Sequence, residues 1–206
     1  MRIDPADIGA SNVYRLMVSA IVPRPIAWTG TRSADGADNL APFSFFMGVG
    51  SSPPAIALSV VDKPDGAQKD TCRNILETEQ FTVSIVPSEH AEAMVGTSTP
   101  LDAADSEFAA YGLTPVEGER VAAPRPAEAR FSMECRLHDS MRVGTTTLLV
   151  GRVVLFHADD AVVVRGRRGN PQVDVGKLDP VARLGGRSYA RVLEPFDLFA
   201  PERVDR

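Results

Sequence analysis

The chain has 206 residues, of which 44% are hydrophobic and 24% charged, and its formal net charge is −5. No apolar run approaches the roughly 20 residues that a membrane helix needs. The acidic balance argues against a nucleic-acid surface, whose affinity comes largely from clustered Lys and Arg. The length predicts one domain over residues 1–206. Because the N-terminus lacks the basic and apolar regions of a secretory signal, we expect a cytoplasmic protein.

The apolar spacing predicts an opening helix over residues 12–21, capped by Ser11 or Asn12 and ended by the prolines that follow. Strands then dominate. We expect them at residues 26–31, 41–47, 55–61, 81–86, 130–143, 146–158 and 161–165. The Asp-Gly turn within 33–39 joins the first two strands.

Helical patterns are fewer and shorter. Residues 70–78 and 89–95 have apolar residues on one face, and Ser88 is the expected cap of the second helix. The composition of residues 96–126 predicts a long surface excursion with one helical turn at 106–110. We expect a second loop at residues 166–177. Because a doubly wound sheet needs regular helices between its strands, the pattern indicates a mainly β protein, a closed or nearly closed antiparallel barrel with short flanking helices.

Two segments have the composition of a ligand cleft: residues 23–28, Pro-Arg-Pro-Ile-Ala-Trp, and 39–46, Asn-Leu-Ala-Pro-Phe-Ser-Phe-Phe. Small residues allow backbone N–H and C=O groups to approach the edge of a flat ring. Arg24, held between prolines, suits an anion clamp or an exposed linker. Thr29 and Thr31 share one strand face, where they offer hydroxyls or are ordinary strand residues. Core packing is the favoured role for Trp28.

Residues 68–74 open the next helix with Gln-Lys-Asp-Thr-Cys-Arg-Asn. Free backbone N–H groups and the positive dipole end make a helix N-terminus a phosphate site, to which Lys69, Thr71 and Arg73 add two cations and a hydroxyl. Asp70 would repel a phosphate unless it turns away to cap the helix. An ordinary capped helix with solvated basic residues fits this heptad equally well.

Signatures of side-chain catalysis are missing. The sequence has no GxSxG, GxxxxGK[ST], HExxH or GxGxxG motif. His90, His138 and His157 have no ligand-like spacing, and two distant cysteines suggest free thiols rather than a disulfide or a zinc site. We therefore predict no catalytic side chain and no metal site, and expect a cofactor to carry the chemistry.

An ordered set of motifs resembles the flavin reductase-like family. It comprises the segments 23–28 and 39–45, the turn at 36–39, the double proline at 53–54, Lys-Asp-Thr at 69–71 with Asn-Ile at 74–75, and the closing Arg-Leu-Gly-Gly-Arg-Ser-Tyr at 183–189. The match runs in the same order over residues 13–189.

The resemblance implies an FMN-binding split barrel, an antiparallel Greek-key barrel that works as a homodimer with the flavin near the interface. It also implies reduction of flavin by NADH or NADPH, with electrons passing to a small-molecule acceptor or a partner monooxygenase. Carried over residue by residue, the cofactor-binding positions are Arg24, Ile26, Ala27, Trp28, Thr29, Thr31, Asn39, Leu40, Ala41, Ser44, Lys69, Thr71 and Asn74.

One departure limits the mechanism. Shorter flavin reductases that resemble this chain often carry Gly-Asp-His where this chain reads Gly144-Thr145-Thr146, so a histidine role in nicotinamide handling is not carried over. An FMN-holding module that receives electrons from a protein partner stays open as an alternative. An oxidase of the pyridoxamine phosphate type shares the fold, but its motifs are not found.

Overall fold

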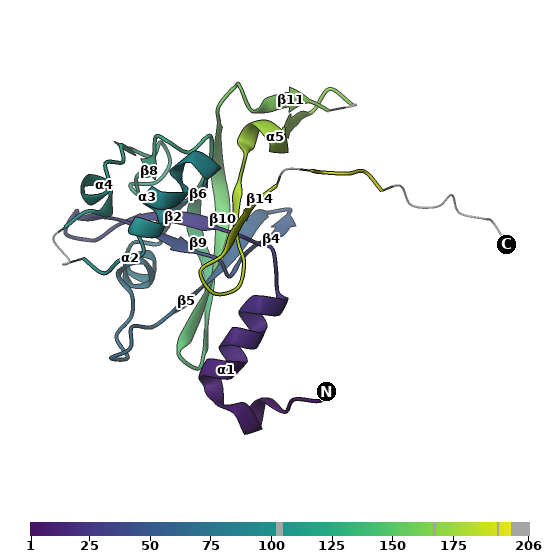
Figure 1. Ribbon diagram of the computed structural model, residues 1–206. Coiled ribbons are helices and arrows are strands. Elements are labelled where there is room, and N and C mark those ends of the chain that lie inside the picture. The colour runs from purple at the N-terminus through teal and green to yellow at the C-terminus, as the bar shows by residue number, and fades with distance from the viewer. Residues whose placement is uncertain (102–104, 167, 193, 199–206) are drawn as a thin grey trace.

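The computed structural model describes residues 1–101, 105–166, 168–192 and 194–198 (Figure 1). Its main feature is a seven-stranded antiparallel sheet in the order β3-β2-β6-β9-β10-β5-β4. These strands are β2 (Ala27–Arg32), β3 (Asp38–Phe43), β4 (Phe46–Ser51), β5 (Pro54–Val61), β6 (Gln80–Ile85), β9 (Phe131–Val143) and β10 (Thr146–Ala158).

Smaller elements flank this sheet. Three short sheets are formed by β1 (Arg24–Pro25) with β13 (Val181–Arg183) and β14 (Tyr189–Arg191), by β7 (Pro115–Val116) with β8 (Arg125–Pro126), and by β11 (Val163–Arg165) with β12 (Pro171–Val173). The helices are α1 (Pro5–Ala20), α2 (Asp70–Thr78), the 3-10 turn η1 (Ser88–His90), α3 (Ala91–Gly96), α4 (Glu107–Ala110) and α5 (Val175–Leu178). In the described ranges, no helix is both long and apolar enough to cross a membrane.

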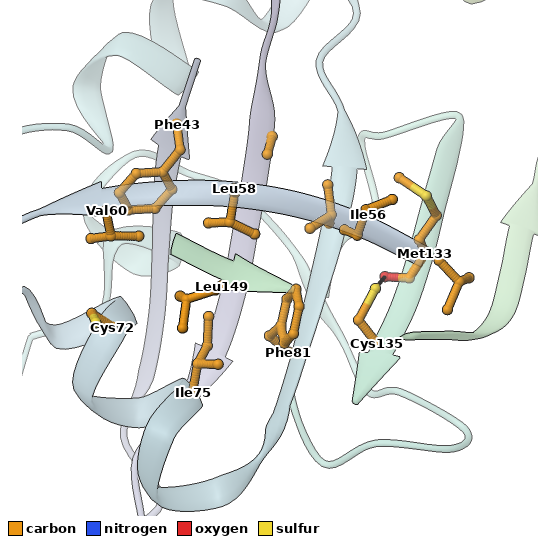
Figure 2. Close-up of a cluster of buried hydrophobic side chains, with 13 residues drawn as sticks. Phe43, Ile56, Leu58, Val60, Cys72, Ile75, Phe81, Met133, Cys135 and Leu149 are labelled. Carbon is orange, nitrogen blue, oxygen red and sulfur yellow. Dashed lines mark hydrogen bonds between the residues drawn. The ribbon is translucent and has the colours of Figure 1, made fainter. Parts of the chain in front are cut away.

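The sheet closes on itself around an apolar cluster. Strands β3 and β4 follow each other in the chain but lie at opposite edges of the sheet. Phe43 from one edge strand and Leu58 and Val60 from next to the other edge belong to the same buried cluster, together with Ile75 of α2. Figure 2 shows these side chains pointing into a common interior. The predicted mainly β antiparallel barrel with short helices is therefore confirmed.

The expected strand over 41–47 was wrong as a single element. The structure ends β3 at Phe43 and begins β4 at Phe46, and between them the chain crosses from one sheet edge to the other. Pro42 has no N–H to donate, and the carbonyl of Phe45 already accepts the N–H of Ser59 at 2.9 Å. Residues 44–45 therefore connect the two edge strands where the barrel closes, and we call them the seam.

The opening helix begins earlier than expected. Asp4 caps α1 by accepting the N–H of Ala6 at 2.9 Å, and Pro5 occupies the first turn, where its missing N–H costs nothing. Gly9, with φ of 70°, kinks the helix. Only Val18 of α1 is buried, and Figure 1 shows the helix projecting from the barrel.

The other helices follow the sequence more closely. The prediction of α2 over 70–78 is confirmed, as is the helical turn at 107–110 within the expected range. Ser88 was wrong as a helix cap, because its hydroxyl donates to the Asp179 carboxylate while η1 and α3 form without a side-chain cap in the described structure. The expected loop at 166–177 contains β12 and the first turn of α5.

Buried polar groups fasten the segment 119–124 to the barrel. The Glu134 carboxylate accepts the backbone N–H groups of Glu119 at 2.8 Å, Arg120 at 2.6 Å and Val121 at 3.1 Å. The Thr82 hydroxyl donates to the carbonyl of Pro124 at 2.6 Å. Residues 119–124 are therefore a fixed wall of the molecule.

Candidate functional site

A cleft of about 530 Å³ opens between β3, the start of α2 and the segment after α3. Its volume lies in the range of small-molecule and cofactor sites. Five of the residues that the resemblance assigns to cofactor binding line it: Asn39, Ala41, Lys69, Thr71 and Asn74. We call it the β3–α2 cleft.

Two asparagines from different elements meet at one hydroxyl beside this cleft. Nδ2 of Asn39 donates to Oγ1 of Thr31 at 3.2 Å and to Oγ1 of Thr71 at 3.0 Å, and Nδ2 of Asn74 donates to the same Thr31 oxygen at 3.1 Å. The buried Oδ1 of Asn74 has no hydrogen-bond partner in the described structure. Leaving a buried acceptor unpaired costs about 1–3 kcal/mol. One acceptor on a residue that lines the cleft is thus left unsatisfied by the described part of the protein.

Helix α2 begins without a side chain that satisfies its first N–H groups. Lys69 is the N-cap residue, and no side-chain cap bond is found in the part of the chain that the structure describes. Asp70 instead pairs with Nζ of Lys63 at 3.0 Å and with Nη2 of Arg73 at 2.6 Å. Burial acts to raise the pKa of Asp70, but these two cations outweigh it and the pKa is lowered. The repulsion that Asp70 would exert on an anion is therefore offset by its own partners.

Glu107 is a cleft residue that sequence reasoning missed. It lies on α4, is 9% exposed, lines the β3–α2 cleft, and accepts the backbone N–H of Leu40 through Oε2 at 3.0 Å. Burial raises its pKa. The N–H of Leu40 is consequently occupied by the protein itself. Nothing local distinguishes this glutamate from the solvated acids of the same excursion.

A second cleft, of about 580 Å³, lies between α1, residues 24–26 and the loop between β13 and β14, and we call it the α1 cleft. Three predicted site residues line it: Arg24, Ile26 and Ser44. Pro42 and Ser98 line both clefts, so the two are adjacent.

Arg24 is held by backbone carbonyls. Its Nη1 donates to the carbonyls of Val18 at 2.7 Å and Ile21 at 2.6 Å, its Nη2 to that of Leu184 at 3.1 Å, and its Nε to the Ser44 hydroxyl at 3.3 Å. The side chain is buried, so the interpretation as an exposed linker residue was wrong. Burial lowers the pKa of Arg24, and the nearby charge of Arg183 acts in the same direction.

The remaining predicted residues line neither cleft. Their side chains are fully buried: Ala27, Trp28, Thr29, Thr31 and Leu40. Trp28 fills the core, as favoured from the sequence, and its Nε1 donates to Oγ1 of Thr97 at 3.0 Å. Any effect of this group on a ligand would come through positioning of the cleft walls, and their role in binding stays a prediction.

A family model for the flavin reductase like domain matches residues 18–169. The chain belongs to the flavin reductase-like family. An uncharacterised protein of Halalkalibacterium halodurans is 37% identical over 98% of this chain and 97% of its own length. Membership in this family supports an oxidoreductase role that uses flavin.

Solved structures of flavin reductase-like split barrels agree in fold. Nitrilotriacetate monooxygenase component B from Bacillus cereus has a TM-score of 0.89 at 34% identity, covering 96% of this chain and 98% of that one. Pseudomonas fluorescens 2-nitrobenzoate 2-nitroreductase NbaA has a TM-score of 0.86 at 27% identity, covering 100% and 99%. Flavoredoxin of Desulfovibrio vulgaris (Miyazaki F) has a TM-score of 0.74 at 27% identity, covering 86% and 91%.

Proposed function

We propose that this chain is an FMN-dependent oxidoreductase of flavin reductase type, which uses NADH or NADPH to reduce flavin and passes the electrons to a further acceptor. The observation that carries the proposal is the β3–α2 cleft, in which the unpaired acceptor of Asn74 lies beside an uncapped helix N-terminus. FMN has a hydroxyl-bearing ribityl chain next to a terminal phosphate, so it presents the donors and the anion that these two features lack.

The cleft residues fit each part of FMN. A ribityl hydroxyl would donate to Oδ1 of Asn74, and the phosphate would take the N–H groups at the start of α2 together with the ammonium of Lys69. Ala41 and Pro42 give a small, apolar surface for the flat ring. The Leu40 N–H is not part of this set because Glu107 accepts it.

When bound, FMN supplies the redox chemistry by accepting a hydride from NAD(P)H and giving up two electrons to the acceptor. The chain's residues bind and orient the partners and exclude water, and direct hydride transfer needs no side-chain acid or base. The segment where shorter flavin reductases often carry Gly-Asp-His begins here with Gly144 in the exposed β9–β10 turn, with φ of 56°, and contains no histidine. No catalytic side chain is therefore proposed.

We also propose that the chain works as a homodimer. Met47, Val61, Met141 and Val143 are each at least half exposed. Val61 and Val143 both pair with Thr146, so these two side chains point to the same face of the sheet, and Met141 lies two residues before Val143 on that face. A second copy would cover this apolar face. Sedimentation that gives the mass of one 22.1 kDa chain at micromolar concentration would exclude the dimer.

The test of the cofactor site is FMN titration of the double variant Lys69→Ala, Thr71→Ala. Loss of a charge-assisted hydrogen bond of about 1.5–3 kcal/mol weakens binding about 10- to 100-fold. Lys177→Ala, an exposed lysine that lines neither cleft, is the matched control and should leave the affinity unchanged. Equal FMN affinity in the double variant would overturn the phosphate assignment.

Electron donation is tested separately by stopped-flow mixing of the FMN-loaded protein with NADH and with NADPH. Rapid bleaching of the flavin by either donor supports the reductase. Bleaching only with a reduced protein partner would favour the electron-transfer module, and a purified protein that takes up no FMN would overturn the proposal altogether.

A further inference from the structure

The α1 cleft is lined by three guanidinium groups and, among the residues that the structure describes, by no acidic residue. The arginines are Arg15, Arg24 and Arg183. None of the three forms an ion pair within the described ranges, whereas five other arginines do: Arg32, Arg73, Arg130, Arg142 and Arg191. The electrostatic potential in this cleft is consequently positive, and no negative charge among the described lining residues offsets it.

Arg24 makes this imbalance costly. It is 5% exposed, and its donors go to three carbonyls and one hydroxyl rather than to a carboxylate. A buried charge needs a counter-charge to recover the free energy lost on leaving water. An anion in the cleft would supply that counter-charge next to Arg24 and Arg183.

Arg183 is oriented for such an anion. Its guanidinium stacks on the ring of Tyr189, 4.4 Å from the centroid, and Nη2 donates to the carbonyl of Gly186. Stacking restricts the orientation of the Arg183 guanidinium. Little side-chain entropy is therefore lost when its other N–H groups bind an oxyanion. Tyr14, Val18 and Met94 line the same cleft and give it an aromatic and apolar part.

We propose that the α1 cleft binds the oxyanion group of the substrate that exchanges electrons at the neighbouring β3–α2 cleft. The two clefts meet at Pro42 and Ser98, so one molecule spans from the arginines toward the proposed flavin ring. The oxyanion is a pyrophosphate if the substrate is the dinucleotide donor, or a carboxylate if it is the acceptor. The assignment to a redox substrate rests on the proposed function, whereas anion binding itself does not.

Binding is measured by calorimetric titration of the purified protein with inorganic pyrophosphate and with benzoate at low ionic strength. We expect at least one anion to bind the wild type and to bind Arg183→Gln at least tenfold more weakly. Arg152→Gln removes the same charge from an exposed position outside both clefts and should bind like the wild type. No binding of either anion, or equal binding by all three proteins, would overturn the anion site.

Steady-state kinetics then identify the source of the anion. A KM for NADH that rises about tenfold in Arg183→Gln, with FMN affinity unchanged, assigns the site to pyrophosphate. A KM that rises for 4-nitrobenzoate but not for uncharged nitrobenzene assigns it to an acceptor carboxylate. If neither KM changes, the substrate subsite is refuted even though the flavin site stands. If FMN does not bind while calorimetry shows the anion, the proposed function fails and the anion site stands.

Discussion

Replacement of Glu134 by Gln tests how the excursion is held against the barrel. The carboxylate is fully buried, and each oxygen is used: Oε1 accepts the Glu119 N–H and contacts Nε2 of His157 at 2.6 Å, while Oε2 accepts the N–H groups of Arg120 and Val121. An amide keeps one acceptor and turns the other oxygen into a donor. The Glu119 N–H then faces an NH₂ group and loses its partner.

The cost follows from these contacts. One orphaned N–H costs about 1–3 kcal/mol, and a neutral acceptor weakens the other two bonds by about 0.5–1 kcal/mol each. We expect Glu134→Gln to lower the free energy of unfolding by about 2–5 kcal/mol, which for a chain of this size lowers Tm by about 4–20 °C. Glu134→Ala removes both acceptors and should cost more.

Urea denaturation followed by circular dichroism measures this loss. The control is Glu119→Gln, whose side chain is 71% exposed and whose effect should stay within about 0.5 kcal/mol. A Glu134→Gln protein as stable as the control would refute the argument that the carboxylate fastens the excursion.

The pH dependence provides a second check. Burial acts to raise the pKa of Glu134, but the hydrogen bonds from the Glu119 N–H and from His157 outweigh it and lower the pKa. A carboxyl whose pKa is lowered by folding stabilises the protein above its unfolded value, about 4.3, and this contribution is lost as pH falls through the folded value. The stability difference between wild type and Glu134→Gln should therefore be largest above about pH 5 and shrink in more acidic solution.

Two further substitutions test other contacts. Gly30→Ala would bring a methyl group into hard contact with the carbonyl of Pro124 and within 2.6 Å of the Thr82 hydroxyl. We expect it to lower the free energy of unfolding, measured in urea, by about 2–4 kcal/mol. A decrease below about 1 kcal/mol would contradict this close packing. Glu107→Ala orphans the buried N–H of Leu40 and should cost about 1–3 kcal/mol. Because burial raises the pKa of Glu107, its favourable contribution is lost as pH rises through the folded value. Glu107→Gln, which cannot ionise, should flatten that pH dependence above pH 5, and an unchanged profile would contradict the assignment.

Local patterns predicted the parts of the site that depend on local structure. Helix α2 and its N-terminal Lys69 were visible from the apolar period, whereas Asn39, expected in the turn over 33–39, lies in strand β3 (Asp38–Phe43). The contacts that complete the site join distant residues. Glu107 reaches Leu40 across 67 positions, and Arg24 reaches the Leu184 carbonyl across 160. A single sequence shows the residue types at such positions but not which of them meet.

The missed boundaries have the same origin. The signal for an earlier start of α1, Asp4 before a proline, is present in the sequence, but Gly9 in the second turn interrupts the helical pattern. The break between Phe43 and Phe46 has no local turn signal because it arises from barrel closure. Apolar residues continue through this break, so the hydrophobic pattern alone predicts a single strand.

The seam at residues 44–45 links ligand binding to the integrity of the barrel. Pro42 lines both clefts and Ser44 the α1 cleft, so ligands seated there would rest on the segment that carries the chain from one sheet edge to the other. The Phe45 carbonyl of this segment accepts the Ser59 N–H at 2.9 Å, in the register of the β4–β5 pair. A ligand that binds only the folded, closed barrel stabilises that barrel by mass action. The amide proton of Ser59 would then exchange with solvent more slowly in the ligand-loaded protein, which makes one backbone hydrogen bond a local gauge of cleft occupancy.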